Sequence, residues 1–311
     1  MTIFVVLTGG LGNQIFQLYA GLALSKSKPL ILIEGLGTPK MRHLNAEIFD
    51  FELPENVHKF HKNQFSQLSK KAFSYLISRN TRTSFIYQNF IIKSLLSTAC
   101  RFVLILSIRR FVMICLANDL GFSNFKLSKY PTLIVGYFQS FYWYEQLKLI
   151  KSNINLQLST LNFSYHDLIE EAKIIRPTII HIRLGDYKYE HQIQVVSKNY
   201  YLKAVNELCK NLNVEVYWLF SDEPEIAINF IPANILHKTR IIHNPKASSS
   251  ETLDLMKYGT NYVLSNSTFG WWAAMFSVNA PNFIFVPKPW FALIESPKYL
   301  IPSTWKEVLR D

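Results

Sequence analysis

Residues 3–14 read IFVVLTGGLGNQ, in which an apolar run is followed directly by a cluster of glycines. Residues 14–25 then show helical spacing, with apolar side chains at Ile15, Leu18 and Leu22. A short run without a polar face predicts a buried strand, and 3.6-residue spacing predicts a helix. We therefore expect a strand, a glycine turn and a helix, which together open a βαβ unit.

The same alternation recurs along the chain. The further apolar runs are LILIE (30–34), TLIV (132–135), TIIHIRL (178–184), VEVYWLFS (214–221), YVLSNS (262–267) and FIFVP (283–287). Apolar strands separated by helices predict a parallel sheet that is covered on both faces. We expect an α/β fold of two Rossmann-like lobes facing a cleft, with an N-terminal lobe over 1–150 and a C-terminal lobe over 151–311. Residues 58–130, basic and rich in apolar helical stretches, are expected to form a helical insertion in the first lobe.

Composition and charge limit the class of protein. The 311 residues are 49% hydrophobic and 18% charged, which excludes a disordered chain. The net charge of +11 favours an anionic partner, which is a phosphate, a nucleic acid or an acidic membrane. Three cysteines without C-x-x-C spacing indicate neither a disulfide framework nor a zinc site.

Residues 95–117 are apolar and long enough to cross a bilayer. Arg101, Arg109 and Arg110 interrupt this stretch, and one arginine in mid-span costs about 2.5 kcal/mol or more. We therefore expect a buried helix or one lying in a membrane surface in preference to a membrane span.

Ligands of such sheets bind beyond the carboxyl ends of the strands, so functional side chains are expected there. After the first strand, Gly10 and Gly12 allow close backbone approach to a ligand, and Asn13 stands where the helix begins. An ordinary tight turn capped by Asn13 explains the same residues. No G-K-[ST] sequence occurs, which excludes a P-loop.

The segment HIRLGDY (181–187) ends another predicted strand. Alternation along the strand puts His181 and Arg183 on one side. The planar guanidinium of Arg183 suits a phosphate, while Asp186 can orient it or accept a proton. The alternative is a structural ion pair between Arg183 and Asp186.

Two further strand ends carry small polar or acidic side chains. In SNSTFGWW (265–272), Ser267 and Thr268 open a helix and suit an anion, although a plain helix cap explains them equally well. Asp222 follows VEVYWLFS in the corresponding position, where an N-cap is the alternative. The sequence contains no D-x-D, H-E-x-x-H or G-x-S-x-G motif, so a phosphorylated ligand has to be neutralised by Arg, Lys and helix ends.

Taken together, the chain resembles the α-1,2-fucosyltransferases of glycosyltransferase family 11, from about Thr2 to Phe291. The segments that carry the resemblance, in order, are GGLGNQIFQ (9–17), GYFQSFYWY (136–144), HIRLGDY, NYYLKAV (199–205), FSDE (220–223), SNSTFGWW and VPKPWF (286–291). The resemblance implies a B-type glycosyltransferase fold and GDP-β-L-fucose as donor. It also implies inverting transfer of fucose to the 2-hydroxyl of a galactoside, with no metal and no other cofactor.

The resemblance also implies roles for individual residues. Arg183 corresponds to the first arginine of the family's H-x-R-R-x-D motif and would hold the donor pyrophosphate, whereas Leu184 replaces the second arginine. Asp186 is our candidate for the general base and His181 the second candidate. The remaining expected donor contacts are Gly10, Gly12 and Asn13 from the first lobe, and Asp222, Ser267 and Thr268 from the second.

Two alternatives remain open at this point. One is a GDP-fucose transferase that acts on a different acceptor hydroxyl, because the donor motifs do not determine the acceptor. The other is a non-enzymatic basic module that binds a membrane or a nucleic acid, which the charge of +11 supports. For the enzyme we expect a bacterial cytoplasmic location, peripheral to the anionic inner face of the membrane, with acceptors that include lipid-linked glycans and with no nucleic-acid partner.

Overall fold

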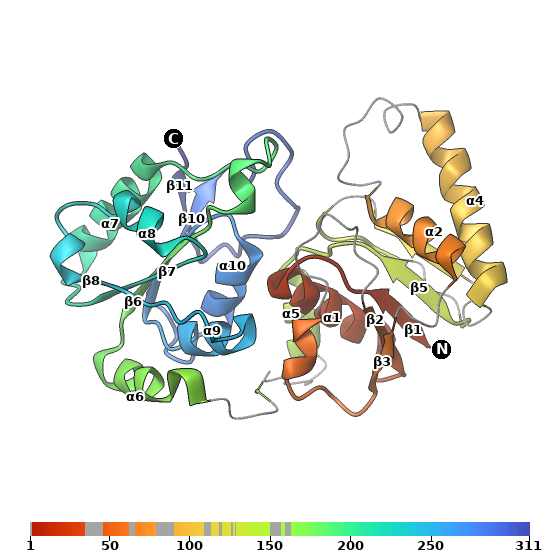
Figure 1. The fold of residues 1–311 in the computed structure, drawn as a ribbon, viewed down its shortest axis with the longest axis horizontal. Coiled ribbons are helices and arrows are strands. Elements are labelled where there is room, and N and C mark those ends of the chain that lie inside the picture. Colours follow the sequence, from red (N-terminus) through yellow and green to blue (C-terminus); the bar gives the residue numbers. More distant parts are fainter. Residues whose placement is uncertain are drawn as a thin grey trace. The chain divides into compact units, whose positions relative to one another are not determined.

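A computed structural model describes residues 2–34, 46–61, 66–78, 90–108, 113–117, 120–125, 127, 129–149, 157–158 and 163–311. The chain divides into two compact units, which Figure 1 draws as ribbons. Unit 1 comprises Met1–Leu156 and Pro297–Leu300, and unit 2 comprises Gln157–Ser296 and Ile301–Asp311.

Unit 1 contains a parallel sheet with the strand order β3-β2-β1-β5-β4 in its described part. The strands are β1 (Ile3–Val6), β2 (Leu30–Glu34), β3 (Val57–His61), β4 (Met113–Leu116) and β5 (Thr132–Val135). The helices are α1 (Leu11–Ser25), α2 (Gln67–Ser78), α4 (Phe90–Ile108) and α5 (Tyr142–Leu149), with a 3-10 turn η1 (Glu47–Asp50).

Both faces of this sheet are covered, as the apolar strands predicted. Phe4 and Val6 pack in one apolar cluster with Phe73 of α2 and Leu104 of α4. Val5 points the opposite way and lies against α1, where a Cβ added at Gly21 would come within 2.9 Å of Val5 Cγ2. The first unit is therefore a helix–sheet–helix sandwich (Figure 1).

The structure corrects two expectations for this unit. The stretch 58–130 is not only a helical insertion, because it contains most of β3 and all of β4, which are the two edge strands of the sheet. Residues 95–117 are not one helix either, since α4 ends at Ile108 and Met113–Leu116 pairs with β5. Among the described helices, none has the length and apolar character that crossing a membrane requires.

Unit 2 contains a second parallel sheet, with the order β11-β10-β9-β6-β7-β8. Its strands are β6 (Thr178–Ile182), β7 (Tyr217–Ser221), β8 (Thr239–Ile241), β9 (Asn261–Leu264), β10 (Phe283–Lys288) and β11 (Lys306–Leu309). Its helices are α6 (His166–Ile175), α7 (Lys198–Asn211), α8 (Pro224–Ala227), α9 (Ser249–Met256) and α10 (Thr268–Met275), and its 3-10 turns are η3 (Phe163–Tyr165), η4 (Asp186–Lys188), η5 (Ile228–Phe230) and η6 (Leu236–Lys238). The α/β class is confirmed in both units.

Strand β6 lies between β7 and β9 and positions the residues discussed below. Ile180, Ile182 and Leu184 all enter one apolar cluster, which also contains Tyr200 and Tyr201 of α7. Because side chains alternate along a strand, the intervening positions face the other side of the sheet. Since parallel strands end at the same edge, the segments that follow β6, β7 and β9 emerge together.

Candidate functional site

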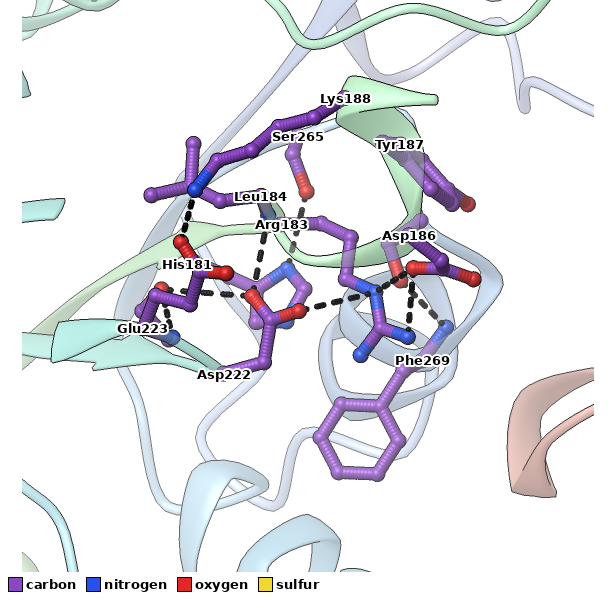
Figure 2. A network of polar contacts seen from close by, with 12 residues as sticks. His181, Arg183, Leu184, Asp186, Tyr187, Lys188, Asp222, Glu223, Ser265 and Phe269 are labelled. Atoms are coloured by element: carbon purple, nitrogen blue, oxygen red, sulfur yellow. Dashed lines mark hydrogen bonds and ion pairs between the residues drawn. The ribbon is translucent and has the colours of Figure 1, made fainter. Parts of the chain in front are cut away.

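Three strand ends meet at one edge of the unit 2 sheet, as Figure 2 shows. Strand β6 is followed directly by Arg183, β7 by Asp222 and β9 by Ser265. The sequence predicted functional side chains at these strand ends, and the structure brings the three segments into one polar network.

Arg183 is the centre of this network. Its Nη2 lies 2.8 Å and its Nε 3.0 Å from Asp186 Oδ1, and its Nε lies 3.4 Å from Asp222 Oδ2. The ring centroid of Tyr187 is 5.8 Å from the guanidinium carbon. The remaining nitrogen, Nη1, has no polar partner among the residues that the structure describes. One edge of the guanidinium is therefore open to a ligand (Figure 2).

Neighbouring carboxylates stabilise the charged form of Arg183. Burial opposes the charged form, but Asp222 and Asp186 outweigh this effect and raise the pKa of Arg183 above its usual value. Two carboxylates against one guanidinium leave the network with an excess of negative charge in the ligand-free protein. An incoming phosphate can bind the Nη1 donors and would compete with these carboxylates only for the donors on Nη2 and Nε.

Asp222 ties the end of β7 to the loop after β6. Its Oδ1 accepts a hydrogen bond from the backbone N–H of Leu184 at 2.9 Å, while its Oδ2 faces Arg183. A Cβ at Gly185 would lie 2.4 Å from Asp222 Oδ2, so a side chain at this position would displace the carboxylate from its present place. In this geometry Asp222 holds both the loop backbone and the arginine in place.

His181 is buried behind the network. Its Nδ1 lies 3.1 Å from Ser265 Oγ, and a Cβ at Gly270 would come within 2.8 Å of that same nitrogen. Burial lowers the pKa of His181 to about 4, with Asp222 opposing and Arg183 adding to the shift. The imidazole is therefore neutral at pH 7, and its burial favours a positioning role over direct contact with a substrate.

The SNST segment is joined to the HIRLGDY segment. Asn266 donates from Nδ2 to the carbonyls of Ile193 and Gln194, both at 3.1 Å, and its own carbonyl accepts from the Tyr187 hydroxyl at 3.3 Å. Ser267 is the N-cap of α10, and its Oγ accepts from the backbone N–H of Phe269 at 3.3 Å. Thr268, also a predicted donor contact, is the first residue of α10.

Leu184 occupies the position of the family's second arginine, and its side chain is not at the site. It is fully buried in the apolar cluster under α7, and only its backbone N–H reaches Asp222. In this chain the position therefore supplies core packing on one side of the strand, whereas Arg183 points to the other.

The predicted residues of the first unit form a separate junction. Asn13 Oδ1 accepts a hydrogen bond from Gln139 Nε2 at 2.9 Å, which joins the GGLGNQ and GYFQS segments. Gly10 is the N-cap of α1, and Gly12 is buried in the first turn of that helix. Gly9 has a φ of 74°, and a Cβ there would lie 2.5 Å from Asn13 Nδ2.

Gln17 and Gln139 lie within the GGLGNQIFQ and GYFQSFYWY motifs, and the structure shows their contacts. Gln17 donates from Nε2 to Thr8 Oγ1 at 2.7 Å and to the carbonyl of Gly136 at 3.0 Å, and its Oε1 accepts from the Thr8 N–H at 2.9 Å. These contacts brace the glycine turn against the loop after β5. The sequence signal for this role is that Gln17 lies on the apolar face of the predicted helix, because a buried amide needs hydrogen-bond partners.

Within the described parts of both units, no group of three His, Cys, Asp or Glu side chains is arranged to hold a metal ion. The groups of the unit 2 site that suit an anion are the Arg183 guanidinium, hydroxyls and the N-terminus of α10, and they lie beside the carboxylates of Asp186 and Asp222.

Two parallel-sheet units, with an arginine where strands of the second sheet end, suit an enzyme that binds a phosphorylated ligand. The chain belongs to glycosyl transferase family 11, whose sequence profile matches residues 2–290. The family predicted from the motifs is thereby confirmed.

Two curated relatives from Escherichia coli match. An alpha-1,2-colitosyltransferase is 25% identical over 307 residues, covering 92% of this chain and 91% of the relative. The O-antigen biosynthesis glycosyltransferase WbnK is 29% identical over 119 residues, covering 37% of this chain and 39% of its own length.

Among solved structures, the fucosyltransferase NodZ from Bradyrhizobium aligns with a TM-score of 0.52 at 14% identity, covering 95% of this chain and 99% of that one. A second NodZ structure, described as an alpha-1,6-fucosyltransferase soaked with GDP-fucose, aligns with a TM-score of 0.51 at 13% identity, with the same coverage. At these identities the likeness bears on the fold alone, and the predicted B-type glycosyltransferase fold is confirmed.

Proposed function

We propose that the protein transfers L-fucose from GDP-β-L-fucose to the 2-hydroxyl of a galactoside, with inversion and without a metal ion. Membership of family 11 supports glycosyl transfer. The alpha-1,2-colitosyltransferase that matches over 92% of the chain supports a 1,2-linkage. The single observation that carries the donor assignment is the open Nη1 edge of Arg183 at the point where three strand ends converge.

Arg183 is proposed to bind the donor diphosphate. The departing GDP gains negative charge as the sugar–phosphate bond stretches and the sugar becomes oxocarbenium-like. A guanidinium and the backbone N–H groups at the start of α10 supply positive charge to that leaving group without a metal. Ser267 and Thr268 stand at that helix start, and Asp222 keeps Arg183 oriented.

The acceptor hydroxyl needs a base that can reach solvent. Asp186 is our first candidate, because its carboxylate is 48% exposed and is held by Arg183 at 2.8 Å. Binding of a diphosphate to Arg183 would release Asp186 from that ion pair, which makes the carboxylate available to the acceptor. His181, the second candidate, would have to act from a buried position.

The remaining parts of the proposal concern the first unit and the cellular setting. Gly10, Gly12 and Asn13 are proposed to approach the donor through the glycine turn before α1. We propose a bacterial cytoplasmic enzyme at the inner face of the membrane that acts on glycans, including lipid-linked ones. The match to an O-antigen biosynthesis glycosyltransferase supports this setting.

Ligand-dependent thermal unfolding in EDTA tests the donor and metal assignments together. GDP at 100 times its dissociation constant should stabilise the protein by about 2.7 kcal/mol, whereas ADP and UDP at the same concentration should have little effect. Linkage analysis of the product by NMR, after incubation with galactosides, tests the 2-hydroxyl. Equal stabilisation by all three nucleotides would contradict the guanosine assignment, and loss of turnover in EDTA would contradict metal independence.

A colitosyl donor is the second candidate. The relative that matches along nearly the full chain carries the name of a colitosyltransferase, and colitose is fucose without its 3-hydroxyl. A site that hydrogen-bonds the 3-hydroxyl rejects a sugar lacking it, because a buried partner is left unpaired. Parallel kcat/KM measurements with GDP-fucose and GDP-colitose decide between the two, and a higher value for GDP-colitose would replace fucose in the proposal.

A further inference from the structure

The positive charge of this protein is concentrated in one segment. Residues 56–118 contain ten Lys or Arg and no Asp or Glu, which leaves 23 basic and 22 acidic residues in the rest of the chain. Nearly the whole net charge of +11 therefore belongs to the stretch that contains α2 and α4. Neither helix contributes a residue to the site described above.

Helix α4 has two faces of different environment. Ser97 and Leu104 are buried, and Leu104 packs on the core of unit 1. On the opposite face, Leu95, Phe102 and Leu106 are 65%, 64% and 56% exposed. Together with exposed Ala99, these residues follow the spacing i, i+4, i+7, i+11, which places them in one line along the helix. We call these four residues the α4 stripe.

The stripe is long and belongs to the basic segment 56–118. It extends over roughly 17 Å at 1.5 Å per residue. Lys70 and Lys71 belong to α2, which packs against α4 in the core cluster of unit 1, whereas Arg101 of α4 has a buried Nε and lies on the inner side of the helix, near Cys115 of β4. Figure 1 shows α4 along the outside of unit 1, beside α2. An apolar line within a segment that carries only positive charge is the pattern of a helix that lies in a membrane interface.

We propose that the α4 stripe is a docking surface for an anionic lipid bilayer. The three large apolar side chains enter the boundary between headgroups and acyl chains, and the positive charge of residues 56–118 attracts anionic headgroups. A nucleic acid would use the charge but not the apolar line. A second copy of this chain would bring two strongly positive segments together, which opposes self-association through this face. The proposal does not depend on the identity of the sugar donor.

Vesicle co-sedimentation of the full chain tests this surface. We expect binding to phosphatidylcholine vesicles that contain phosphatidylglycerol, and little binding to phosphatidylcholine alone. Binding should weaken at about 1 M salt, where the Debye length falls to about 3 Å. The triple variant Leu95→Ser, Phe102→Ser and Leu106→Ser should bind roughly a hundredfold more weakly, because it loses the apolar contribution.

A matched control replaces three exposed apolar side chains of unit 2, in the triple variant Ile174→Ser, Val278→Ser and Leu293→Ser. This control should bind vesicles like the unchanged protein, and all three proteins should unfold at similar temperatures because only exposed positions change. Equal vesicle binding by the stripe variant and the control would overturn the proposal. So would an absence of binding to anionic vesicles, or a dimer in light scattering that the stripe variant alone dissociates.

Discussion

Arg183 is held by two carboxylates, and its Nη1 has no polar partner in the described part of the chain. In a purely structural ion pair, the arginine would serve only to join the loops after β6 and β7. In a diphosphate site, the same pair keeps the guanidinium oriented until the ligand arrives. A lysine at position 183 keeps the positive charge but lacks the planar guanidinium that binds a phosphate through two N–H groups. The Arg183→Lys variant therefore distinguishes the two roles.

We expect Arg183→Ala to lower kcat/KM by more than a hundredfold, which corresponds to about 3 kcal/mol of transition-state stabilisation. Arg183→Lys should recover little of this activity. Steady-state kinetics with the nucleotide-sugar donor measure both effects. Arg240→Ala is the matched control, because Arg240 forms an exposed ion pair with Glu171 at 2.9 Å on the edge strand β8. Near-normal turnover by Arg183→Ala would remove Arg183 from the diphosphate site.

His181 predicts a pH dependence of stability. Burial lowers its pKa to about 4, against 6.5 for an ordinary histidine. Between these values the unfolded chain binds a proton that the folded protein does not, so the free energy of unfolding falls as the pH drops from 6.5 towards 4. The loss attributable to this group is about 3 kcal/mol.

Urea unfolding of the unchanged protein and of His181→Gln between pH 4 and 7 measures this effect. Glutamine does not titrate, so the difference in unfolding free energy between the two proteins should vary across this range. It should be largest in favour of the native histidine at neutral pH. A difference that is independent of pH would show that the pKa of His181 is the same in the folded and the unfolded protein.

At the scale of elements, the two adjacent residues after β6 have different functions. Arg183 faces the polar network, whereas Leu184 is fully buried with Ile180 and Ile182 beneath α7. The alternation of a strand therefore decides which of the two positions in the family's paired-arginine motif can reach a phosphate in this chain. The sequence alone suggested that a phosphate contact was missing at Leu184, and the structure assigns that side chain to the core.

We therefore expect Leu184→Arg to destabilise the protein and not to increase activity. A guanidinium in this apolar cluster has no carboxylate partner, and an uncompensated buried charge costs about 3–5 kcal/mol. Leu184→Met, which conserves volume, should cost less than about 1.5 kcal/mol. Denaturant unfolding compares the two variants. An arginine variant as stable as the methionine variant would mean that the side chain can turn out of the core.

At the scale of the whole molecule, the features proposed for donor binding and for membrane docking lie in different segments of the chain. Unit 2 carries the arginine network, unit 1 carries the braced glycine turn before α1, and the basic segment with α2 and α4 carries most of the net charge. Donor binding and membrane docking should therefore be separable by location along the sequence.

Hydrogen exchange with and without GDP measures this separation. GDP should slow exchange in the segments after β6, β7 and β9, because their backbone N–H groups lie at the proposed diphosphate site. Slower exchange in the glycine turn at residues 9–13 is expected from the proposed donor contacts of unit 1. Helices α2 and α4 should be unaffected. Protection confined to α2 and α4 would mean that GDP binds the basic segment nonspecifically.

Much of this protein was determined by local sequence. Apolar runs such as IFVVLT and TIIHI are short, rich in β-branched residues and without a polar face, which favours buried strands, and the intervening helices then favour a parallel sheet. The ordered motifs were sufficient for the family, and the position of Arg183 at a strand end followed from the same pattern. These features depend on neighbours within a few residues, which is why they are readable from the sequence.

Only the tertiary structure decided which side chains meet and which face each one takes. The bond from Asp222 to the Leu184 N–H joins residues 38 apart, and the contact of His181 with Ser265 joins residues 84 apart. The sequence also continued one helix over 95–117, whereas pairing with β5 makes Met113–Leu116 a strand. An apolar run of that kind suits a helix and a buried strand equally, and the hydrogen-bonding partner that chooses between them lies elsewhere in the chain.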